Sequence, residues 1–319
     1  MKRFLTILYI LCGLAVLAGC GDKNAVLEPM DAAMLAGYEV VNAAVNISQA
    51  RQSGNVEEMA VVVEAGQQVQ SAQSLRLQAL QASIFRDFVN RRANSLQADI
   101  ATTNDSVGNF AGHIAITFDD GPHPVLTPML LDALDERDIK ATFFLLGREV
   151  DRYPDIVARM YAAGHSIGNH SYRHPRFIDI SRQRIVDEIE STNRSIQAAT
   201  GSLPTLLRPP YGARNNTVLD VARDMDMSVV LWSVDPRDWD HRNALIVSDT
   251  IVNYASDGSV VLLHDIHETS IEAAVLAIDA LVARGYVFVT VEELFGLSEV
   301  ALQAGEVYRS VYHSLGVSQ

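Results

Sequence analysis

Short segments that could do chemistry occur where predicted strands end. The first, Asp119-Asp120-Gly121-Pro122, follows the apolar run Ile114–Phe118. Successive side chains of a strand point to opposite faces, so two adjacent Asp residues can face one site only where the strand ends. Gly121 and Pro122 supply that break. Taken alone, however, Asp-Asp-Gly is also an ordinary turn.

A pair of histidines, His170 and His174, follows the next short run, Ser166–Asn169. Imidazoles four residues apart can converge if the segment makes one turn, and Pro175 disfavours a longer helix. Two His and one carboxylate form a known catalytic zinc set that leaves a position for water. A His pair alone is commonly solvated surface, but together with the Asp pair it favours a metal site.

Three more segments end predicted strands: Arg208-Pro209-Pro210-Tyr211, Asp235-Pro236-Arg237-Asp238-Trp239 and Leu262-Leu263-His264. Each is unremarkable alone. Five strand ends that offer Asp, His, Arg, Asp and His are difficult to explain as a solvated rim. The only cysteines are Cys12 and Cys20, which excludes a Cys-based metal site, so His, Asp or Glu must hold any metal.

From about Asn109, β-rich runs alternate with helical patterns. The predicted strands are Ile114–Phe118, Ala141–Leu146, Ser166–Asn169, Thr205–Arg208, Ser228–Ser233, Ser259–His264 and Tyr286–Val291. The predicted helices include Thr127–Arg137, Asp151–Ala163, Arg182–Thr200, Asn216–Met225 and Ser270–Arg284. This alternation indicates parallel strands and an α/β fold, with sites at the carboxyl ends of the strands. Periodicity alone does not distinguish an open doubly wound sheet from a barrel.

The composition is that of a globular protein, with 48% hydrophobic and 20% charged residues in 319. The 25 Lys and Arg against 39 Asp and Glu give a net charge of −14, which argues against a general nucleic-acid binder. Eight of the nine histidines lie between His113 and His267, in the part that carries the five segments.

The N-terminus is typical of an exported protein. Met1-Lys2-Arg3 precedes an apolar run, Phe4–Gly19, which is shorter than the roughly 20 residues of a spanning helix. Its end, Leu17-Ala18-Gly19-Cys20, resembles the lipobox of bacterial lipoproteins, which predicts a signal peptide over 1–19 and a lipid on Cys20. The alternative is an uncleaved anchor. Both tether the domain to a membrane outside the cytoplasm, and which membrane stays open.

Residues 20–108 are predicted to form a helical hairpin or stalk. No proline occurs between Pro29 and Pro122, and helix formers dominate near Asp31–Arg51 and Val56–Ala98. We favour a spacer over a specific binding segment, because no catalytic constellation appears there. The predicted catalytic domain spans 109–300, and residues 301–319 are expected to form a C-terminal tail.

The five segments, in this order, resemble the motifs of the polysaccharide deacetylases, carbohydrate esterase family 4. The resemblance covers about Gly112–Leu297. It implies an incomplete, distorted (β/α)7 barrel, which agrees with the seven strands counted above.

The resemblance also implies roles for individual residues. Asp120, His170 and His174 would hold a divalent metal, zinc or alternatively cobalt, nickel or manganese. Asp119 would be the general base and His264 the general acid that protonates the departing amine.

The remaining motif residues would support these groups. Arg208 would pair with Asp119 and hold it ionised, and Asp238 would orient His264. The backbone N–H of Tyr211 would stabilise the oxyanion, while Trp239 and Leu262 would wall a slot for the acetyl methyl. His123 and His267 lie near the motifs, and we expect them to be rim residues without essential roles.

The leading hypothesis is metal-dependent N-deacetylation of an envelope or extracellular glycan that contains N-acetylglucosamine, such as peptidoglycan, chitooligosaccharide or exopolysaccharide. One alternative is an O-acetyl esterase acting on acetylated polysaccharide. Another is a non-catalytic envelope scaffold that binds glycan. The expected partners are the glycan and, through the lipid, a membrane.

Overall fold

The computed structural model describes residues 110–314. The predicted signal peptide, Cys20 and the predicted helical segment over 20–108 therefore lie outside the described residues. Among the helices that are described, none combines the length and hydrophobicity needed to cross a bilayer.

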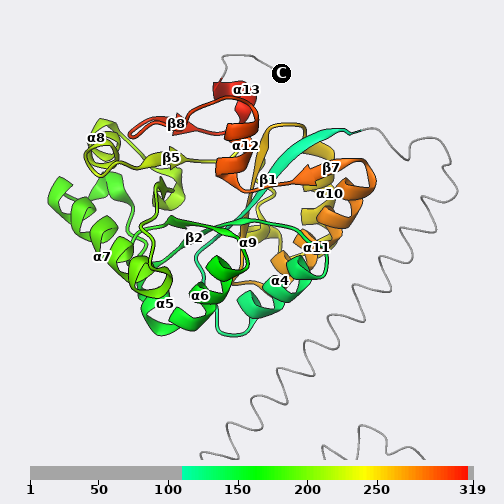
Figure 1. The fold of residues 1–319 in the computed structure, drawn as a ribbon, viewed down its shortest axis with the longest axis horizontal. Helices are drawn as coiled ribbons and strands as arrows, with labels where there is room; N and C mark the ends of the chain where they lie inside the picture. The colour runs from blue at the N-terminus through cyan, green and yellow to red at the C-terminus, as the bar shows by residue number, and fades with distance from the viewer. Residues whose placement is uncertain (1–109, 315–319) are drawn as a thin grey trace, which may run out of the picture. The chain divides into compact units, whose positions relative to one another are not determined.

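A parallel β-sheet forms the centre of the described part of the chain (Figure 1). Its order is β6-β1-β2-β3-β4-β5-β8, and β7 pairs with the start of β1. All seven predicted strands are confirmed, with ends that differ by a few residues. The strands are β1 (Gly112–Asp119), β2 (Thr142–Leu145), β3 (Ser166–Asn169), β4 (Leu206–Leu207), β5 (Ser228–Val230), β6 (Ser259–His264), β7 (Tyr286–Phe288) and β8 (Val307–Tyr308).

The sheet curls until its two ends approach each other. Val234, just after β5, forms a parallel bridge with Val261 of β6, and Ser310 bridges Ser259. Single bridges from the segments that follow β5 and β8 thus reach β6 in place of a full strand ladder, which leaves the barrel incomplete. The incomplete, distorted barrel implied by the family resemblance is confirmed.

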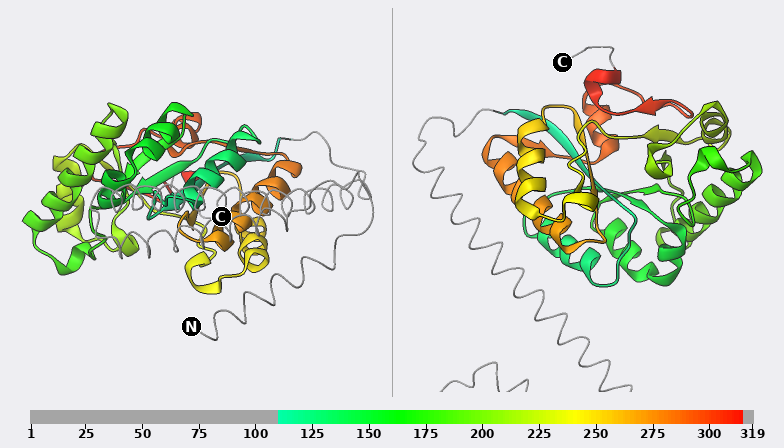
Figure 2. Two further views of the ribbon diagram at one scale, coloured as in Figure 1. Left: turned by 90° about the horizontal axis from the view of Figure 1, so that it is seen from below. Right: turned by 180° about the vertical axis from the view of Figure 1, so that it is seen from behind.

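Helices surround the rim of the sheet, from α8 and α7 through α5, α6 and α4 to α11 and α10 (Figure 1). Figure 2 shows α10 and α11 side by side, and they pack against each other. Pro154 begins a new helix inside the predicted Asp151–Ala163 segment. The helices are α4 (Leu126–Asp135), α5 (Gly147–Arg152), α6 (Pro154–Ala162), α7 (Arg182–Thr200), α8 (Asn216–Asp224), α9 (Asp238–His241), α10 (Ala244–Tyr254), α11 (Glu268–Ala283), α12 (Val291–Leu297) and α13 (Val311–Ser314), with short 3₁₀ turns at Phe177–Asp179 and Pro210–Gly212.

Strand β1 is buried on both faces, as expected of a central parallel strand. Ile114, Ile116 and Phe118 belong to one apolar cluster, which also includes residues of α4, α10 and α11. Ala115, on the other face, belongs to a second cluster with residues of α12 and β8. The same face carries Thr117 and Asp119 farther along the strand.

Residues after 300, expected to be a tail, contribute to the sheet instead. Val307 and Tyr308 form β8, which pairs with Val229 and Val230 of β5. Tyr308 is 7% exposed and joins the cluster around Ala115. A two-residue strand leaves almost no periodic signal, so only its tertiary pairing reveals it.

Candidate active site

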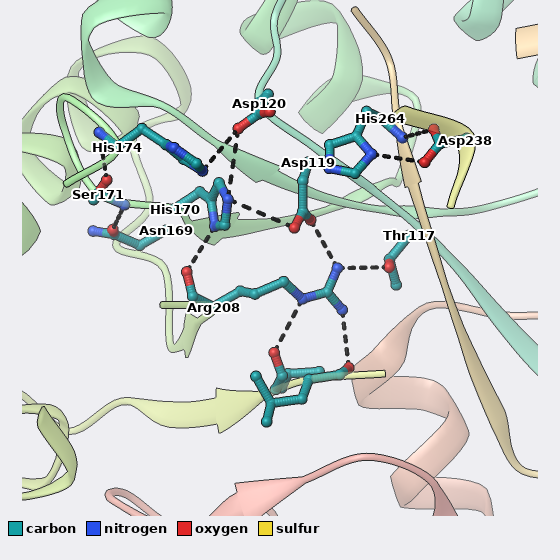
Figure 3. A network of polar contacts seen from close by, with 12 residues as sticks. Thr117, Asp119, Asp120, Asn169, His170, Ser171, His174, Arg208, Asp238 and His264 are labelled. Carbon is teal, nitrogen blue, oxygen red and sulfur yellow. Dashed lines mark hydrogen bonds and ion pairs between the residues drawn. The ribbon is translucent and has the colours of Figure 1, made fainter. Parts of the chain in front are cut away.

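Parallel register brings the five motif segments to one edge of the sheet. Asp119 lies opposite His264 in the β1–β6 pair and opposite Phe144 in the β1–β2 pair. Asn169, directly before His170, lies opposite Leu207, directly before Arg208. Figure 3 shows polar side chains from all five segments gathered at this edge: Asp119, Asp120, His170, His174, Arg208, Asp238 and His264.

Arg208 forms the floor of the site and is completely buried. Its Nη1 donates to the Asp119 carboxylate at 2.7 Å and to Thr117 Oγ1 at 2.8 Å, and Nε and Nη2 donate to the carbonyls of Val230 and Leu231. The guanidinium also lies over the Phe144 ring, 3.9 Å from its centroid. These contacts hold the guanidinium, and therefore its positive charge, in one position beside Asp119, because its Nε and both Nη atoms are hydrogen-bonded.

Asp119 is 3% exposed, and this burial raises the pKa of its carboxyl above the ordinary value. Arg208 and His264 oppose the shift by stabilising the carboxylate. The result is a carboxylate with a fixed orientation that is more basic than one in water.

His264 and Asp238 form the second pair. Asp238 Oδ1 lies 2.9 Å from His264 Nδ1, and Oδ2 accepts the His264 backbone N–H at 2.8 Å. Burial by itself would lower the pKa of His264, but the hydrogen bond and charge of Asp238, with Asp119 and Asp120, raise it to about 9. The arrangement keeps the imidazole protonated at neutral pH. Its Nδ1–H is bonded to Asp238, and its Nε2–H is the proton that Asp238 does not bind.

Asp120, His170 and His174 form the third group, in which one carboxylate oxygen faces both imidazoles. Asp120 Oδ1 is 3.6 Å from His170 Nε2 and 3.4 Å from His174 Nε2. His170 Nδ1 lies 2.7 Å from the carbonyl of Arg208, so this nitrogen donates and Nε2 is left with its lone pair. Burial lowers the pKa of His170 to about 3, which keeps the ring neutral.

These residues fit a divalent metal. The three ligand atoms all lie within 4.8 Å of one another, and buried Asp120 Oδ1 has no hydrogen-bond donor among the described residues. A tetrahedral zinc ion with ligands at about 2.0–2.1 Å would separate those ligands by roughly 3.3 Å, close to the separations from Asp120 Oδ1. His170 also has the carbonyl contact on its second nitrogen that orients histidine ligands in metal sites.

Strained backbone presents these ligands. Asp120, Ser171 and His174 have φ values of 76°, 71° and 65°, in the left-handed region that residues with side chains rarely adopt. Side chains hold the second loop in place: Asn169 Oδ1 accepts the Ser171 N–H at 2.8 Å, and Ser171 Oγ accepts the His174 N–H at 2.9 Å. The surrounding hydrogen bonds thus over-determine a conformation that the chain would otherwise avoid.

The predicted oxyanion and acetyl residues lie around the same edge. The Tyr211 ring packs against the His174 ring with centroids 4.6 Å apart, and Tyr211 is also left-handed, with φ 61°. Leu262 is buried in β6, two residues before His264. Trp239 follows Asp238 on α9 and is 47% exposed, with the Arg237 guanidinium over its ring.

A pocket of about 490 Å³ opens beside the metal cluster, and Asp120 and His174 form part of its wall. This volume lies in the range of small-molecule sites. The rest of the lining comes from the loops after β1, β2 and β6, from α5 and from the residue between α5 and α6, and consists of Pro122, His123, Pro124, Leu146, Arg148, Glu149, Tyr153 and Ile266.

The two other nearby histidines differ in position. His123 lies in the wall of this pocket, and its Nδ1 accepts the backbone N–H groups of Val125 and Leu126. The His267 ring centroid is 6.4 Å from that of His264, and its Nδ1 accepts from Arg242 at 3.3 Å. Each ring therefore has one nitrogen committed to a local contact.

Several supporting residues were not identified from the sequence. Thr117 precedes Asp119 by two, so period-two alternation could have placed it on the same face. Glu188 of α7 accepts the backbone N–H groups of Tyr172 and Arg173 at 2.9 and 2.7 Å, yet nothing in its local sequence distinguishes it from a surface acid. Asn169 and Asp265 adjoin motif histidines, and adjacency was the only available signal.

Comparisons with known proteins agree with this geometry. The family model described as polysaccharide deacetylase matches residues 108–230. The chain is 42% identical over 195 residues to the peptidoglycan-N-acetylglucosamine deacetylase PgdA of Listeria monocytogenes, which covers 61% of this chain but only 41% of that protein. It is 35% identical over 196 residues to a chitooligosaccharide deacetylase of Rhizobium leguminosarum, covering 57% of this chain and 91% of that one.

A solved structure gives the same result. The family 4 acetyl xylan esterase of Clostridium thermocellum, in complex with a cobalt ion, superposes with a TM-score of 0.59 at 35% identity, over 62% of this chain and 98% of that one. The resemblance inferred from the five motifs is therefore confirmed: the chain belongs to the polysaccharide deacetylase family.

Proposed function

We propose that this protein is a metal-dependent deacetylase that removes N-linked acetyl groups from an envelope glycan and releases acetate. The observation that carries this proposal is one arrangement at the sheet edge. A buried Asp119 on Arg208 and an Asp238-held His264 lie on adjacent strands, beside the cluster of Asp120, His170 and His174. A general base, a general acid and a metal set together can catalyse attack of water on an amide and protonation of the departing amine.

Asp120, His170 and His174 would hold the metal. A divalent ion supplies Lewis acidity, which polarises a carbonyl and lowers the pKa of water. Zinc suits two imidazoles and one carboxylate, and cobalt, nickel and manganese are alternatives for the same donors.

Asp119 would act as the general base toward the attacking water. Its Oδ2 lies 3.6 Å from His170 Nε2, so it is within reach of the metal cluster, while its Oδ1 is held by Arg208. One carboxylate oxygen is thus fixed and the other faces the reacting groups. The raised pKa strengthens this carboxylate as a base.

His264 would donate a proton to the departing nitrogen. An amine is a poor leaving group unless it is protonated, so cleavage of an amide needs an acid at this point. Asp238 keeps His264 protonated, because its carboxylate stabilises the imidazolium, and its two hydrogen bonds to His264 fix the position of the ring. The Tyr211 N–H would stabilise the oxyanion, with Trp239 and Leu262 beside the acetyl methyl.

The proposed substrate is a glycan that contains N-acetylglucosamine. The relatives named above are deacetylases of peptidoglycan and of chitooligosaccharide, and the chain spans about two fifths of the length of the Listeria protein. The pocket beside Asp120 and His174 offers room for a sugar ring next to the acetyl group. The signal peptide predicted over 1–19 and the resemblance of the segment ending at Cys20 to a lipobox support attachment to a membrane, facing the envelope.

Release of free amines tests the proposal. The purified protein is incubated with N-acetylglucosamine oligomers and with peptidoglycan, first after chelation and then with added zinc or cobalt. We expect amine and acetate in equal amounts with metal and neither after chelation. Activity that survives complete metal removal, or none with any metal, contradicts the proposal.

An O-acetyl esterase is the second candidate, and the similarity to an acetyl xylan esterase favours it. An alcohol leaves more easily than an amine and needs less acid assistance. His264→Ala therefore distinguishes the two functions. A severe loss of turnover indicates an amide substrate, and a small loss on acetylated xylan indicates an ester.

A further inference from the structure

A second buried carboxyl lies at this edge of the sheet, directly after the proposed acid. Asp265 is completely buried, although it follows the last residue of β6. Burial raises the pKa of its carboxyl to about 7. It has no part in the proposed reaction, and an acid placed in such surroundings is destabilising unless its hydrogen bonds serve the structure.

One oxygen of Asp265 reaches the loop after β1 through a threonine. Thr127 Oγ1, itself completely buried at the start of α4, forms a short hydrogen bond with Asp265 Oδ2. The same Oγ1 accepts the backbone N–H of His123 at 2.7 Å. The hydroxyl thus joins the end of β6 to the loop that begins at Asp120, directly after Asp119 at the end of β1.

The carboxyl of Asp265 also touches this loop directly. A Cβ on Gly121 would lie 2.3 and 2.4 Å from the two oxygens of Asp265, closer than atoms can approach. Gly121 is therefore glycine because Asp265 occupies the space of its side chain. On its other side, the Gly121 carbonyl accepts the N–H of Leu146 at 3.1 Å, so the loop is held between β6 and β2.

We propose that Asp265 and Thr127 are positioning residues that set the distance between the β1 loop and the end of β6. The β1 loop begins with the metal ligand Asp120 and follows the base Asp119, and β6 carries the acid His264. A hydrogen bond between the two segments fixes base, metal cluster and acid relative to one another. This inference rests on the proposed function for the meaning of that spacing, because a shift of about 1 Å between reacting groups can cost about a hundredfold in rate.

The first test uses Thr127, because a threonine can lose its hydroxyl without changing shape. Thr127→Val should lower kcat by at least about tenfold and leave KM within about twofold, since misplacement acts on the chemical step. Thr127→Ser keeps the hydroxyl and should restore most of kcat. The matched control is Thr290→Val, which removes the buried N-cap hydroxyl of α12, paired with Glu293 and lying beside His165 and Ser166 at the start of β3.

A double-mutant cycle then tests whether the two residues act through each other. We expect Asp265→Ala to lower kcat as much as Thr127→Val, and the double variant to be little worse than either single variant. Additive losses, or a Thr127→Val enzyme with the kcat of Thr290→Val, would overturn the proposal. A low kcat in Thr127→Ser equal to that of Thr127→Val would also overturn it.

A readout without turnover separates this inference from the proposed function. Cobalt(II) bound to the protein reports its ligand geometry through its visible absorption spectrum. Thr127→Val should change that spectrum, because Asp120 belongs to the loop that Thr127 holds, whereas Thr290→Val should not. If Thr127→Val alters the spectrum while the wild-type protein is inactive on every glycan, the positioning role is supported and the deacetylase function is rejected. If the wild-type protein is an active deacetylase and Thr127→Val has the wild-type spectrum and full activity, only the positioning role is rejected.

Discussion

The two ends of the strands each bury a histidine, and their surroundings give the two rings opposite properties. At the carboxyl end, Asp238 and nearby carboxylates raise the pKa of His264 to about 9 against the effect of burial. At the amino end, burial and then the charge of Lys140 lower the pKa of His165 to about 4. Burial alone therefore does not prepare a histidine for acid catalysis, and the neighbouring carboxylates decide its charge.

The polar groups around His165 serve the structure. Its Nδ1 accepts the backbone N–H of Ala141 at 3.2 Å, and Thr290 with Glu293 forms a capping box at the start of α12. A pocket of about 380 Å³ lies here too, so a cavity does not distinguish the two ends. His165 Nε2 also has no hydrogen-bond partner in the described residues, as is true of Asp120 Oδ1.

Convergence is the feature that differs. At the carboxyl end three ligand atoms from two loops lie within 4.8 Å of one another, and their backbone is strained. At the amino end, by contrast, the polar contacts join single pairs of groups, such as Ser166 Oγ with Glu292 Oε1 at 2.8 Å and the Ala141 N–H with His165 Nδ1. This division agrees with the general pattern of α/β barrels, in which the carboxyl edge carries function and the amino edge carries stability.

Replacement of the base should give the largest effect. Asp119→Asn keeps the shape and an oxygen for Arg208 but does not accept a proton. We expect kcat to fall by about 10²–10⁴, the usual contribution of a general base. Initial rates on an N-acetylglucosamine oligomer measure this, with metal content checked in both proteins. A variant that retains more than about a tenth of the wild-type rate would remove Asp119 from the base role.

The next effect concerns the pH range of the acid. Without the carboxylate of Asp238 in Asp238→Asn, the pKa of His264 should fall from about 9 toward its ordinary value of 6.5. Activity requires the protonated ring, so the alkaline limb of the rate profile should move to lower pH. At pH 8 a group with an ordinary histidine pKa is only about 3% protonated, so the loss there should be roughly thirtyfold. An alkaline limb at the wild-type position would show that His264 does not donate the proton.

At the amino end, His165 should affect stability and not turnover. Its pKa in the folded protein is below the ordinary 6.5, so the unfolded chain binds the proton more readily. Stability is therefore complete above pH 6.5 and falls as pH decreases toward 4. In His165→Gln this acid loss should shrink by on the order of 1–2 kcal/mol, while kcat near neutral pH stays unchanged. Denaturant unfolding at pH 7 and pH 5 measures it, and equal pH dependence in both proteins would contradict it.

The smallest effect should come from the helix cap. Thr290→Val removes the side chain that accepts the Glu293 N–H, at a cost of about 1 kcal/mol. Tm should fall by about 2–4 °C with no change in kcat. A loss of turnover in this variant would contradict the separation of the two ends.

Much of the site could be predicted because its residues occupy strand ends. Asp119, Asp120, His170, His174, Arg208, Asp238 and His264 were identified from motif segments, and the structure brings them to one edge. Glu188 and Thr127 could not be found in the same way, because each lies on a helix and its partner, Arg173 or Asp265, belongs to another element. Strand β8 was missed for a similar reason, since pairing with β5 is what orders its two residues.

The sequence by itself determined the alternation of strands and helices, the residues at the strand ends and the family. Hydrophobic periodicity and the Gly and Pro residues that end strands and helices are local features, so they can be recognised from the sequence alone. The tertiary structure alone decided that β5 curls toward β6, that Asp119 lies opposite His264, and that Asp265 occupies the space beside Gly121. Those facts depend on register and packing between distant segments. The pKa of His264 follows from them, because its direction is set by carboxylates that only the fold brings near.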